Sequence, residues 1–384
     1  MRIGIVTGEY PPMQGGIADF TRTLTLALRD QGHALFIFTD RRGAASDVGI
    51  DVAAVVNGWG VRSLLRVLGW ARAKRLDAIL LEYEAAAFGM TAPIHWLPRL
   101  LRPTPTVTTF HDLLVPYLFP KAGRLRYQAL LTLANGSRGV IVTNPEDEQR
   151  LRTDLPNLRL TRIPIGSAIP TDTLYGQDRI ALRERLGVAA DTLLIGYFGF
   201  FNASKGIDTL LDGFALAIAH GQTTQGLDAR LLIIGGQTGA SDPTNAIYRA
   251  QIDQHINVLS LGSRVIETGF ASDAEVGAYL QACDVVALPF TDGVSFRRSS
   301  FMAALALGCA IISTTPAIPL PELERAVYLI PPKSAAALAT ALRELADQPT
   351  RRAELSAQAR TLAQDYGWES IASRTVSFLQ NNGA

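Results

Sequence analysis

The sequence predicts an α/β protein built from two doubly wound, Rossmann-like domains. Short, β-rich apolar runs recur along the 384 residues and alternate with stretches of helical periodicity, the pattern of a parallel sheet covered by helices. The length suits two domains better than one. A segment rich in glycine, proline and serine at residues 166–170 separates the two sets of strands and marks the expected boundary.

The first domain is expected over residues 1–168. It starts with a buried strand, "RIGIVTG", and a helix over residues 15–33 follows. Further strands are predicted at the apolar runs "ALFIFTD", "DAILLEY", "TVTTFHD" and "GVIVTN". Helical stretches separate these runs, so strands and helices alternate as in a doubly wound sheet.

The second domain is expected over residues 169–367. Its predicted strands are "TLLIGYFGF", "ARLLIIGG", "VIETGF", "DVVALPF" and "CAIISTT". Helical periodicity lies between them in "GIDTLLDGFALAIA", "DAEVGAYLQAC" and "SSFMAALALG". The last segment, "GWESIASRTVSFLQNN", is predicted to be an amphipathic helix.

Charge and cysteine content narrow the class of protein. Basic side chains number 36 against 35 acidic ones, which argues against a nucleic-acid-binding protein with a broad basic face. The two cysteines lie in apolar segments and are expected to be buried thiols in a reducing compartment. The first residues lack the apolar core of a signal peptide, and no run reaches the ~18–20 apolar residues of a membrane span. We therefore expect a cytoplasmic protein.

Peripheral attachment to a membrane face stays open at this point. The segments "WLPRLLRP" and "AGRLRYQALL" combine basic and apolar residues. Such segments fit either a helix that lies on lipid or the solvated face of a globular protein, and the solvated face is the commoner case.

Ligands of doubly wound domains bind beyond the carboxyl ends of the strands, and two facing domains would place two such edges along one cleft. After the first strand, Gly15 and Gly16 open a helix whose N-terminus could receive a phosphate, although a plain turn would look the same. Their spacing is not the G-x-G-x-x-G of a dinucleotide site.

His111 and Asp112 end another strand. The histidine could donate to a sugar hydroxyl or be purely structural, and Asp112 fits a turn.

Two stretches place cations where a helix dipole disfavours them. Lys205, one of four lysines in the chain, precedes a helix in "SKGIDTLL". In "TDGVSFRRSS", Arg297 and Arg298 stand before another helix, and Ser299 and Ser300 are residue types favoured at an N-cap. A cation beside the positive end of a helix becomes favourable when an anion lies between them. The stretches therefore predict a diphosphate site, with a surface arginine pair as the alternative.

Further candidate contacts to the same ligand follow other strands. Gly235 ends the strand "LLIIGG" and permits a close approach of the backbone, or forms a turn. The remaining candidates come from the loops after strands: Phe200, Phe270, Asp292 and Ser295.

The ordered set of stretches resembles the retaining glycosyltransferases of family 4. The resemblance is carried by "GGIADFTRTLTLALRDQGH", "TFHD", "IPIGSAIP", "SKGIDTLLDGFALA", "LLIIGG", "TGFASDAEVGAYLQACDVVALPF" and "ALALGCAIISTTP". It covers nearly the whole chain and implies the GT-B fold, in which two Rossmann-like domains face a central cleft. The segment 368–384 resembles the family's tail helix, which crosses back to the first domain.

The resemblance also implies roles for individual residues. Gly15 and Gly16 would contact the donor diphosphate or sugar, and His111 would face the donor sugar. Lys205 would neutralise the diphosphate, and backbone N–H groups around Ser299 and Ser300 would hold its distal phosphate.

The sequence departs from the family pattern in the donor region. The family has two glutamates, eight positions apart, which contact the donor sugar and the ribose; Ser295 and Ala303 occupy those positions here. The family's arginine before the lysine falls near Phe200 and is also missing. Arg297 or Arg298 could restore the lost positive charge.

The expected function is a metal-independent, retaining glycosyltransferase that moves a sugar from a UDP- or GDP-sugar to an acceptor hydroxyl. No Asp-x-Asp motif marks a metal site, and the catalytic residues are expected to be His111, Lys205 and Arg298. Because members of the family that the chain resembles commonly act in cell-envelope polysaccharide or glycolipid assembly, we expect one of these settings. Two alternatives stay open: a degenerate GT-B protein that binds a nucleotide or protein partner without catalysis, and another nucleotide-sugar enzyme such as an epimerase.

Overall fold

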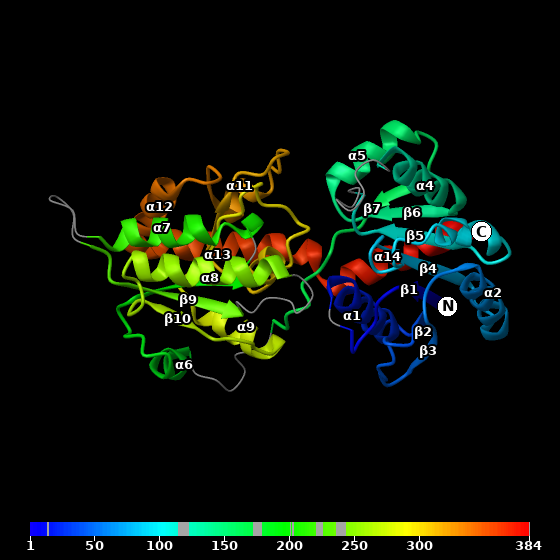
Figure 1. The fold of residues 1–384 in the computed structure, drawn as a ribbon, viewed down its shortest axis with the longest axis horizontal. Helices are drawn as coiled ribbons and strands as arrows, with labels where there is room; N and C mark the ends of the chain where they lie inside the picture. Colours follow the sequence, from blue (N-terminus) through cyan, green and yellow to red (C-terminus); the bar gives the residue numbers. More distant parts are fainter. Residues whose placement is uncertain are drawn as a thin grey trace. The chain divides into compact units, whose positions relative to one another are not determined.

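The computed structural model consists of two α/β units, in agreement with the predicted fold class (Figure 1). It describes residues 1–13, 15–113, 123–171, 179–199, 201, 203–219, 226–235 and 243–383, without the side chains of 123–124, 243–247 and 383. The first unit comprises Met1–Gly166 together with Tyr366–Ala384, and the second comprises Ser167–Asp365. Each unit is described by itself below.

Within the described residues, the sheet of the first unit has seven parallel strands in the order β3-β2-β1-β4-β5-β6-β7. The strands are β1 (Arg2–Thr7), β2 (Ala34–Asp40), β3 (Ile50–Val56), β4 (Ala78–Tyr83), β5 (Thr106–Phe110), β6 (Gly139–Val142) and β7 (Leu160–Arg162). The five inner strands, β2, β1, β4, β5 and β6, are the predicted ones. The two edge strands, β3 and β7, were not predicted.

Helices cover both faces of this sheet. They are α1 (Gly16–Asp30), α2 (Val61–Lys74), η1 (Pro93–Trp96), α3 (Leu97–Leu100), α4 (Gly123–Gly136), α5 (Pro145–Asp154) and α14 (Trp368–Gly383). One core packs α2, α3, α4 and α5 against the sheet through side chains such as Trp70, Leu97 and Leu133. The other core packs α1 and α14, which lie side by side, through Leu24 and Ile371 (Figure 1).

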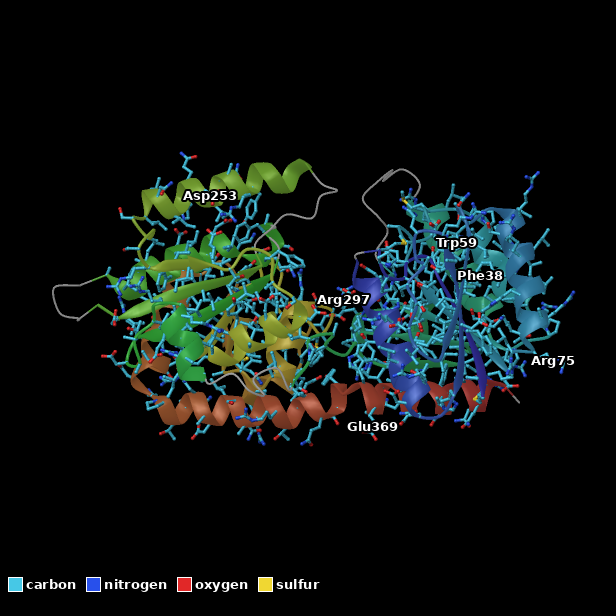
Figure 2. The ribbon with its side chains drawn as sticks, turned by 90° about the horizontal axis from the view of Figure 1, so that it is seen from below. Phe38, Trp59, Arg75, Asp253, Arg297 and Glu369 are labelled. Atoms are coloured by element: carbon cyan, nitrogen blue, oxygen red, sulfur yellow. The ribbon has the colours of Figure 1, made fainter. Side chains whose placement is uncertain are left out.

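Aromatic side chains fill the first of these cores. Figure 2 shows Phe38 and Trp59 inside the unit, whereas Arg75 points away from it. Phe38 and Trp59 make an edge-to-face contact with ring centroids 6.1 Å apart, and Trp59 contacts Phe88 at 4.6 Å. These offset geometries are the favourable ones for aromatic rings, so the core is tightly specified.

The sheet of the second unit has six parallel strands within the described residues, in the order β10-β9-β8-β11-β12-β13. They are β8 (Leu193–Gly199), β9 (Ala229–Gly235), β10 (Val265–Glu267), β11 (Val285–Leu288), β12 (Ile311–Thr314) and β13 (Val327–Ile330). Every predicted strand is present, and β13 is an additional edge strand.

The helices of the second unit are α6 (Arg179–Arg185), η3 (Ala203–Lys205), α7 (Ile207–Ile218), α8 (Pro243–Val258), α9 (Asp273–Ala282), α10 (Ser299–Ala306), α11 (Leu323–Ala326), α12 (Ala335–Asp347), α13 (Pro349–Ala363) and η4 (Gln364–Tyr366). Helices α7, α8 and α12 lie on one face of the sheet, and α6 and α9 lie on the other (Figure 1). Helix α9 begins at a capping box, because the Ser272 hydroxyl accepts from the Glu275 N–H and the Glu275 carboxylate accepts from the Ser272 N–H.

Two expectations about composition can be compared with the structure. Both cysteines are free thiols, and burial raises the pKa of Cys309 to about 12 and that of Cys283 in the same direction. The expectation of buried, unpaired thiols is therefore confirmed for Cys309, whereas Cys283 is unpaired but only partly buried. Among the described helices, none combines the length and apolar character needed to cross a bilayer.

Candidate functional site

Two strands of the second unit's sheet end in glycine residues, so no side chain covers the backbone at this carboxyl edge. Gly199 and Gly235 face each other in register at the ends of β8 and β9. Gly235 has a φ of 87°, a value that favours glycine, and its N–H donates to the Thr268 hydroxyl at 3.1 Å. This glycine pair allows another group to approach the ends of both strands closely, as predicted for Gly235.

Lys205 lies beside this edge in a position that the neighbouring glycine makes possible. It ends the short helix η3, and Gly206 follows with a φ of 70° as the N-cap of α7. A Cβ on Gly206 would lie 1.8 Å from the Pro289 carbonyl oxygen, so only glycine fits. The tight packing holds Lys205 against the loop after β11, where its Nζ lies 5.4 Å from the centre of the Phe290 ring.

Arg298 reaches the same aromatic ring from the far end of the loop that contains Phe290. Its guanidinium carbon lies 4.9 Å from the centre of the Phe290 ring. Its Nη1 donates to the Ser204 hydroxyl at 3.3 Å, and its Nη2 pairs with the carboxylate of Asp292. The structure therefore brings Lys205, Arg298 and Asp292 together around Phe290, as the sequence predicted for a single site.

The electrostatics of this cluster favour an anion. Burial, and then the charge of Arg298, lowers the pKa of Lys205 to about 8, while Asp292 acts in the opposite direction. Asp292 is 61% exposed in its side chain, so its compensation is largely screened by solvent. Within the part of the chain that the structure describes, Lys205 has no ion-pair partner of its own. An anion bound here would replace the solvation that Lys205 has lost.

The N-terminus of α10 lies next to Arg298, but its cap differs from the prediction. Arg298 is the N-cap residue, with φ −84° and ψ 103°, and the helix has no side-chain cap and no acidic residue in its first turn. Ser299 and Ser300 are already helical, so the expectation that a serine caps the helix is wrong. The reason is that the Ser300 side chain turns inward and is 2% exposed.

The hydroxyl group of Ser300 is a further indication of a ligand site in this region. Its hydroxyl oxygen is buried and has no hydrogen-bond partner among the described residues. It lies 4.0 Å from where a Cβ of Gly199 would be, so it faces the bare strand end. A buried hydroxyl without a partner is costly, and a bound acceptor such as a phosphate oxygen would satisfy it.

The other predicted donor contacts are dispersed. Ser295 and Arg297 lie half-buried in the loop before α10, and Figure 2 labels Arg297 there. The Phe270 side chain is 77% exposed after β10. Ala303, which stands where the family has a glutamate, is fully buried within α10. Phe200 lies outside the described residues.

The predicted histidine belongs to the first unit. His111 follows β5 and is 7% exposed, and its Nε2 lies 2.7 Å from the carboxylate of Glu82 on β4. Glu82 is completely buried and also accepts from the Thr109 hydroxyl at 3.3 Å. The Phe20 ring packs edge-on against the imidazole, with centroids 4.6 Å apart. His111 is therefore an oriented side chain whose position a buried carboxylate determines.

Glu82, the partner of His111, is the candidate residue that the sequence did not reveal. Its signal was an acidic residue inside the apolar run "DAILLEY", where a charge is costly unless it has a partner. His111 and Glu82 meet because β4 and β5 are parallel neighbours, with Tyr83 opposite Phe110.

Gly15 and Gly16 also lie in the first unit, at the start of α1. The space that a Cβ of Gly15 would fill already contains the carboxyl of Glu9, whose oxygen lies 2.5 Å from that point. Burial and the neighbouring Glu84 raise the pKa of Glu9. A carboxyl group thus occupies one side of this helix start, whereas none of the described residues comes within 4 Å of the corresponding point on Gly16.

Two family models match the chain. The model described as "Glycosyl transferase 4-like domain" matches residues 15–166, and the model described as "Glycosyl transferases group 1" matches residues 192–348. The matched segments coincide with large parts of the first and second units and together span most of the chain.

Two curated relatives illustrate the similarity. The D-inositol 3-phosphate glycosyltransferase of Kineococcus radiotolerans is 27% identical over 254 residues, which cover 62% of this chain and 55% of that protein. The match thus spans about half the length of this relative. The α-monoglucosyldiacylglycerol synthase of Streptococcus pneumoniae is 23% identical over 335 residues, with 82% and 71% coverage.

The solved structures show the same fold. The Anabaena protein HepE, solved in complex with UDP, superposes with a TM-score of 0.77 at 19% identity, covering 99% of this chain and 100% of that one. The same protein was also solved with UDP-glucose. Since both domain models match in order and the fold agrees along the whole length, the chain belongs to the family 4-like glycosyltransferases with the GT-B fold.

Proposed function

We propose that the protein is a retaining glycosyltransferase that uses a UDP- or GDP-sugar, without a metal ion, to modify an acceptor hydroxyl. The observation that carries this proposal is the desolvated pair of cations, Lys205 and Arg298, beside the buried Ser300 hydroxyl and the glycine pair. Two cations and free helix N–H groups fit a diphosphate. The complexes of the Anabaena protein with UDP and UDP-glucose support a uridine nucleotide.

The second unit is proposed to bind the donor. Lys205 and Arg298 would stabilise the negative charge that develops on the leaving diphosphate, and the N-terminus of α10 with Ser299 and Ser300 would hold the distal phosphate. Gly235 would permit close approach to the strand end. The exposed ring of Phe270 is available for stacking on the base, a contact every base can make.

The first unit is proposed to bind the acceptor and to supply His111. With its imidazole held by Glu82, the histidine would face the donor sugar in one orientation. In a retaining transfer the acceptor hydroxyl attacks on the face from which the diphosphate leaves, and a phosphate oxygen accepts its proton. Positioning and charge stabilisation are then the main tasks of the protein.

Neither of the family's two glutamates is present, which raises a second candidate function. Because Ala303 is buried and has no acceptor atom, the ribose must be held by other groups or not at all. Ser295 has a hydroxyl and replaces the sugar-binding glutamate only in part. A non-catalytic protein that binds a nucleotide or a protein partner is therefore the alternative.

Thermal unfolding with UDP, GDP, ADP and dTDP and their glucose or mannose conjugates is the first test. Because a ligand that binds only the native state raises the unfolding midpoint, we expect one nucleotide to raise it and Lys205→Ala to abolish the rise. Release of that nucleoside diphosphate from its sugar conjugate, in the presence of EDTA, would establish metal-independent activity. Binding without release would support the non-catalytic alternative, and an isomerised sugar would indicate an epimerase.

Arginine variants test whether the diphosphate lies where proposed. Arg298→Ala should weaken nucleotide binding about tenfold, because a charge-assisted hydrogen bond is lost. Arg62→Ala, an exposed position on α2 of the first unit, is the matched control and should leave binding unchanged. Equal effects of both substitutions would refute the proposed site.

We further propose a cytoplasmic setting, with peripheral contact to the inner membrane face, in polysaccharide or glycolipid assembly. The relative from Streptococcus pneumoniae, named as a diacylglycerol-modifying enzyme, supports this setting. The described parts of the two basic-apolar segments, residues 96–103 and 123–131, come together in the first unit, because η1 and α3 pack on α4.

A further inference from the structure

An apolar cavity of about 230 Å³ lies in the first unit, between the end of β4, the helix η1 and the helix α4. Its walls include Tyr83 at the end of β4 and Ala85 after it, Ala92 before η1 and His95 within it, and Ala129 and Leu130 from α4. All these elements belong to the first unit. The apolar lining is typical of small-molecule sites, and the volume is below the roughly 300–1,000 Å³ of pockets for drug-sized ligands, which suits a slender ligand.

The polar atoms in the cavity wall satisfy one another. The His95 Nδ1 lies 2.9 Å from the Ala92 carbonyl oxygen, which can only accept, so Nδ1 carries the proton. Nε2 then accepts from the Tyr83 hydroxyl at 2.9 Å. Burial lowers the pKa of His95, so the ring stays neutral. With these bonds made, both rings offer the cavity carbon surface rather than free donors or acceptors.

The lining of the cavity includes exposed apolar residues and charged residues. Met90 and Leu125 contribute side chains 40% and 76% exposed. Apolar side chains exposed in this way are characteristic of a surface that meets an apolar ligand. The lining also includes two charged residues, Asp112 and Arg126, and Asp112 directly follows His111, the side chain oriented by Glu82.

We propose that this cavity holds the alkyl chain of an amphiphilic acceptor, whose hydroxyl-bearing head lies at Asp112 and Arg126, next to His111. The inference rests on the proposed function, because it names the class of acceptor for that transfer. A free sugar does not suit the cavity, since its hydroxyls would lose water and find few partners on the wall. A single alkyl chain loses nothing on leaving water and gains burial with every methylene.

The test is the binding of n-alkyl β-glucosides to the full-length protein. Methyl, hexyl, octyl and decyl glucoside are used below their critical micelle concentrations, and their affinities are measured by isothermal titration calorimetry. We expect affinity to rise about three- to fourfold per added methylene until the cavity is full. The same order should appear in the rate at which each compound accepts sugar from the nucleotide donor.

Two substitutions in the cavity and one matched control locate the effect. Ala129→Phe fills the cavity and should remove the dependence on chain length, whereas Ala73→Phe, on the exposed face of α2, should leave it intact. Leu125→Ser changes only an exposed side chain at the opening, so it preserves the fold and should reduce the gain per methylene. Thermal unfolding shows whether each variant is folded.

The outcomes separate this inference from the proposed function. Nucleotide binding and donor turnover with no dependence on alkyl length would overturn the inference and leave the proposed function standing. Chain-length-dependent binding that Ala129→Phe abolishes, with no nucleotide binding at all, would support an amphiphile site and overturn the transferase. An unchanged dependence in both Ala129→Phe and Leu125→Ser would place the alkyl chain elsewhere and overturn the inference. Binding only to vesicles, and not to monomeric glucosides, would overturn it in favour of a lipid-surface contact.

Discussion

The carboxyl edges of the two sheets hold polar clusters of opposite kinds. In the second unit, Lys205 and Arg298 lie over one aromatic ring, and the single carboxylate beside them, Asp292, is mostly exposed. In the first unit, His111 and Glu82 are both buried and hydrogen-bonded to each other. A bound anion would stabilise the two cations of the second unit. The side chains of the first unit's pair already satisfy each other without a ligand. The comparison teaches that burial of a polar side chain does not by itself indicate a binding site. A buried charge that has no partner inside the protein is the better indication.

The largest expected effect concerns stability in the first unit. Glu82→Ala leaves the His111 ring and the Thr109 hydroxyl buried without their acceptor, which should lower the free energy of unfolding by about 2–4 kcal/mol. Nucleotide affinity should not change, because the proposed nucleotide site lies in the other unit. Glu369→Ala, on the exposed start of α14, is the control and should cost less than about 1 kcal/mol. Urea unfolding and calorimetry with UDP measure both quantities.

At Lys205 we expect the opposite: a substitution should change nucleotide affinity and leave stability intact. Lys205→Ala should weaken nucleotide binding about 10- to 100-fold, since a charge-assisted contact is lost. It should leave the unfolding midpoint of the free protein unchanged or raise it, because a desolvated cation is removed. Lys333→Ala, at an exposed loop position of the same unit, should affect neither quantity. A lowered midpoint with unchanged affinity would mean that Lys205 is a structural residue.

The pH dependence of binding sharpens the comparison further. With its pKa lowered to about 8, Lys205 is mostly protonated at pH 7 and mostly neutral at pH 9. If only the protonated form binds the diphosphate, affinity should be nearly complete at about pH 7, fall to about half at pH 8 and fall about tenfold between pH 7 and pH 9. Titration calorimetry in two buffers of different ionisation enthalpy would also show proton uptake near pH 8. Lys205→Arg should remove the pH dependence, and a flat profile in the native protein would contradict the assignment.

The smallest effect is expected from the exposed carboxylate. Asp292→Asn releases Arg298 from its ion pair and should tighten nucleotide binding by up to about fivefold, the range of an exposed salt bridge. If Asp292 instead orients the guanidinium for the ligand, the same change should weaken binding. Calorimetry at low and at high salt decides the direction, since the released charge makes binding more sensitive to salt.

The sequence predicted the central strands of both sheets and the edge strand β10, but it missed the other three edge strands. Central strands such as β1 and β11 are continuous apolar runs because both faces are buried. The missed strands β3, β7 and β13 are edge strands whose residues are partly exposed, so their sequences carry a weaker pattern. Their pairing depends on the neighbouring strand rather than on their own composition.

The site was predictable where the signal was local. Lys205 and Arg298 each stand before a helix, and this unfavourable position could be read from the sequence without a structure. The pairing of Glu82 with His111, 29 residues apart, follows only from the register of β4 and β5. The prediction of a serine N-cap on α10 failed for a similar reason. The Ser300 side chain turns toward Gly199 at the end of β8, a residue that is distant in the sequence.

Helix α14 has a consequence for the order in which the chain folds. Its apolar side chains Ile371, Ala372 and Leu379 complete the core that α1 forms on one face of the first sheet. During synthesis, the rest of the first unit emerges early, but α14 emerges only after the whole of Ser167–Asp365. At about 5–20 residues per second, the exposed face of α1 waits on the order of tens of seconds for its cover. The first unit to be made is thus the last to be finished, and its unprotected α1 face is where chaperones should bind the nascent chain.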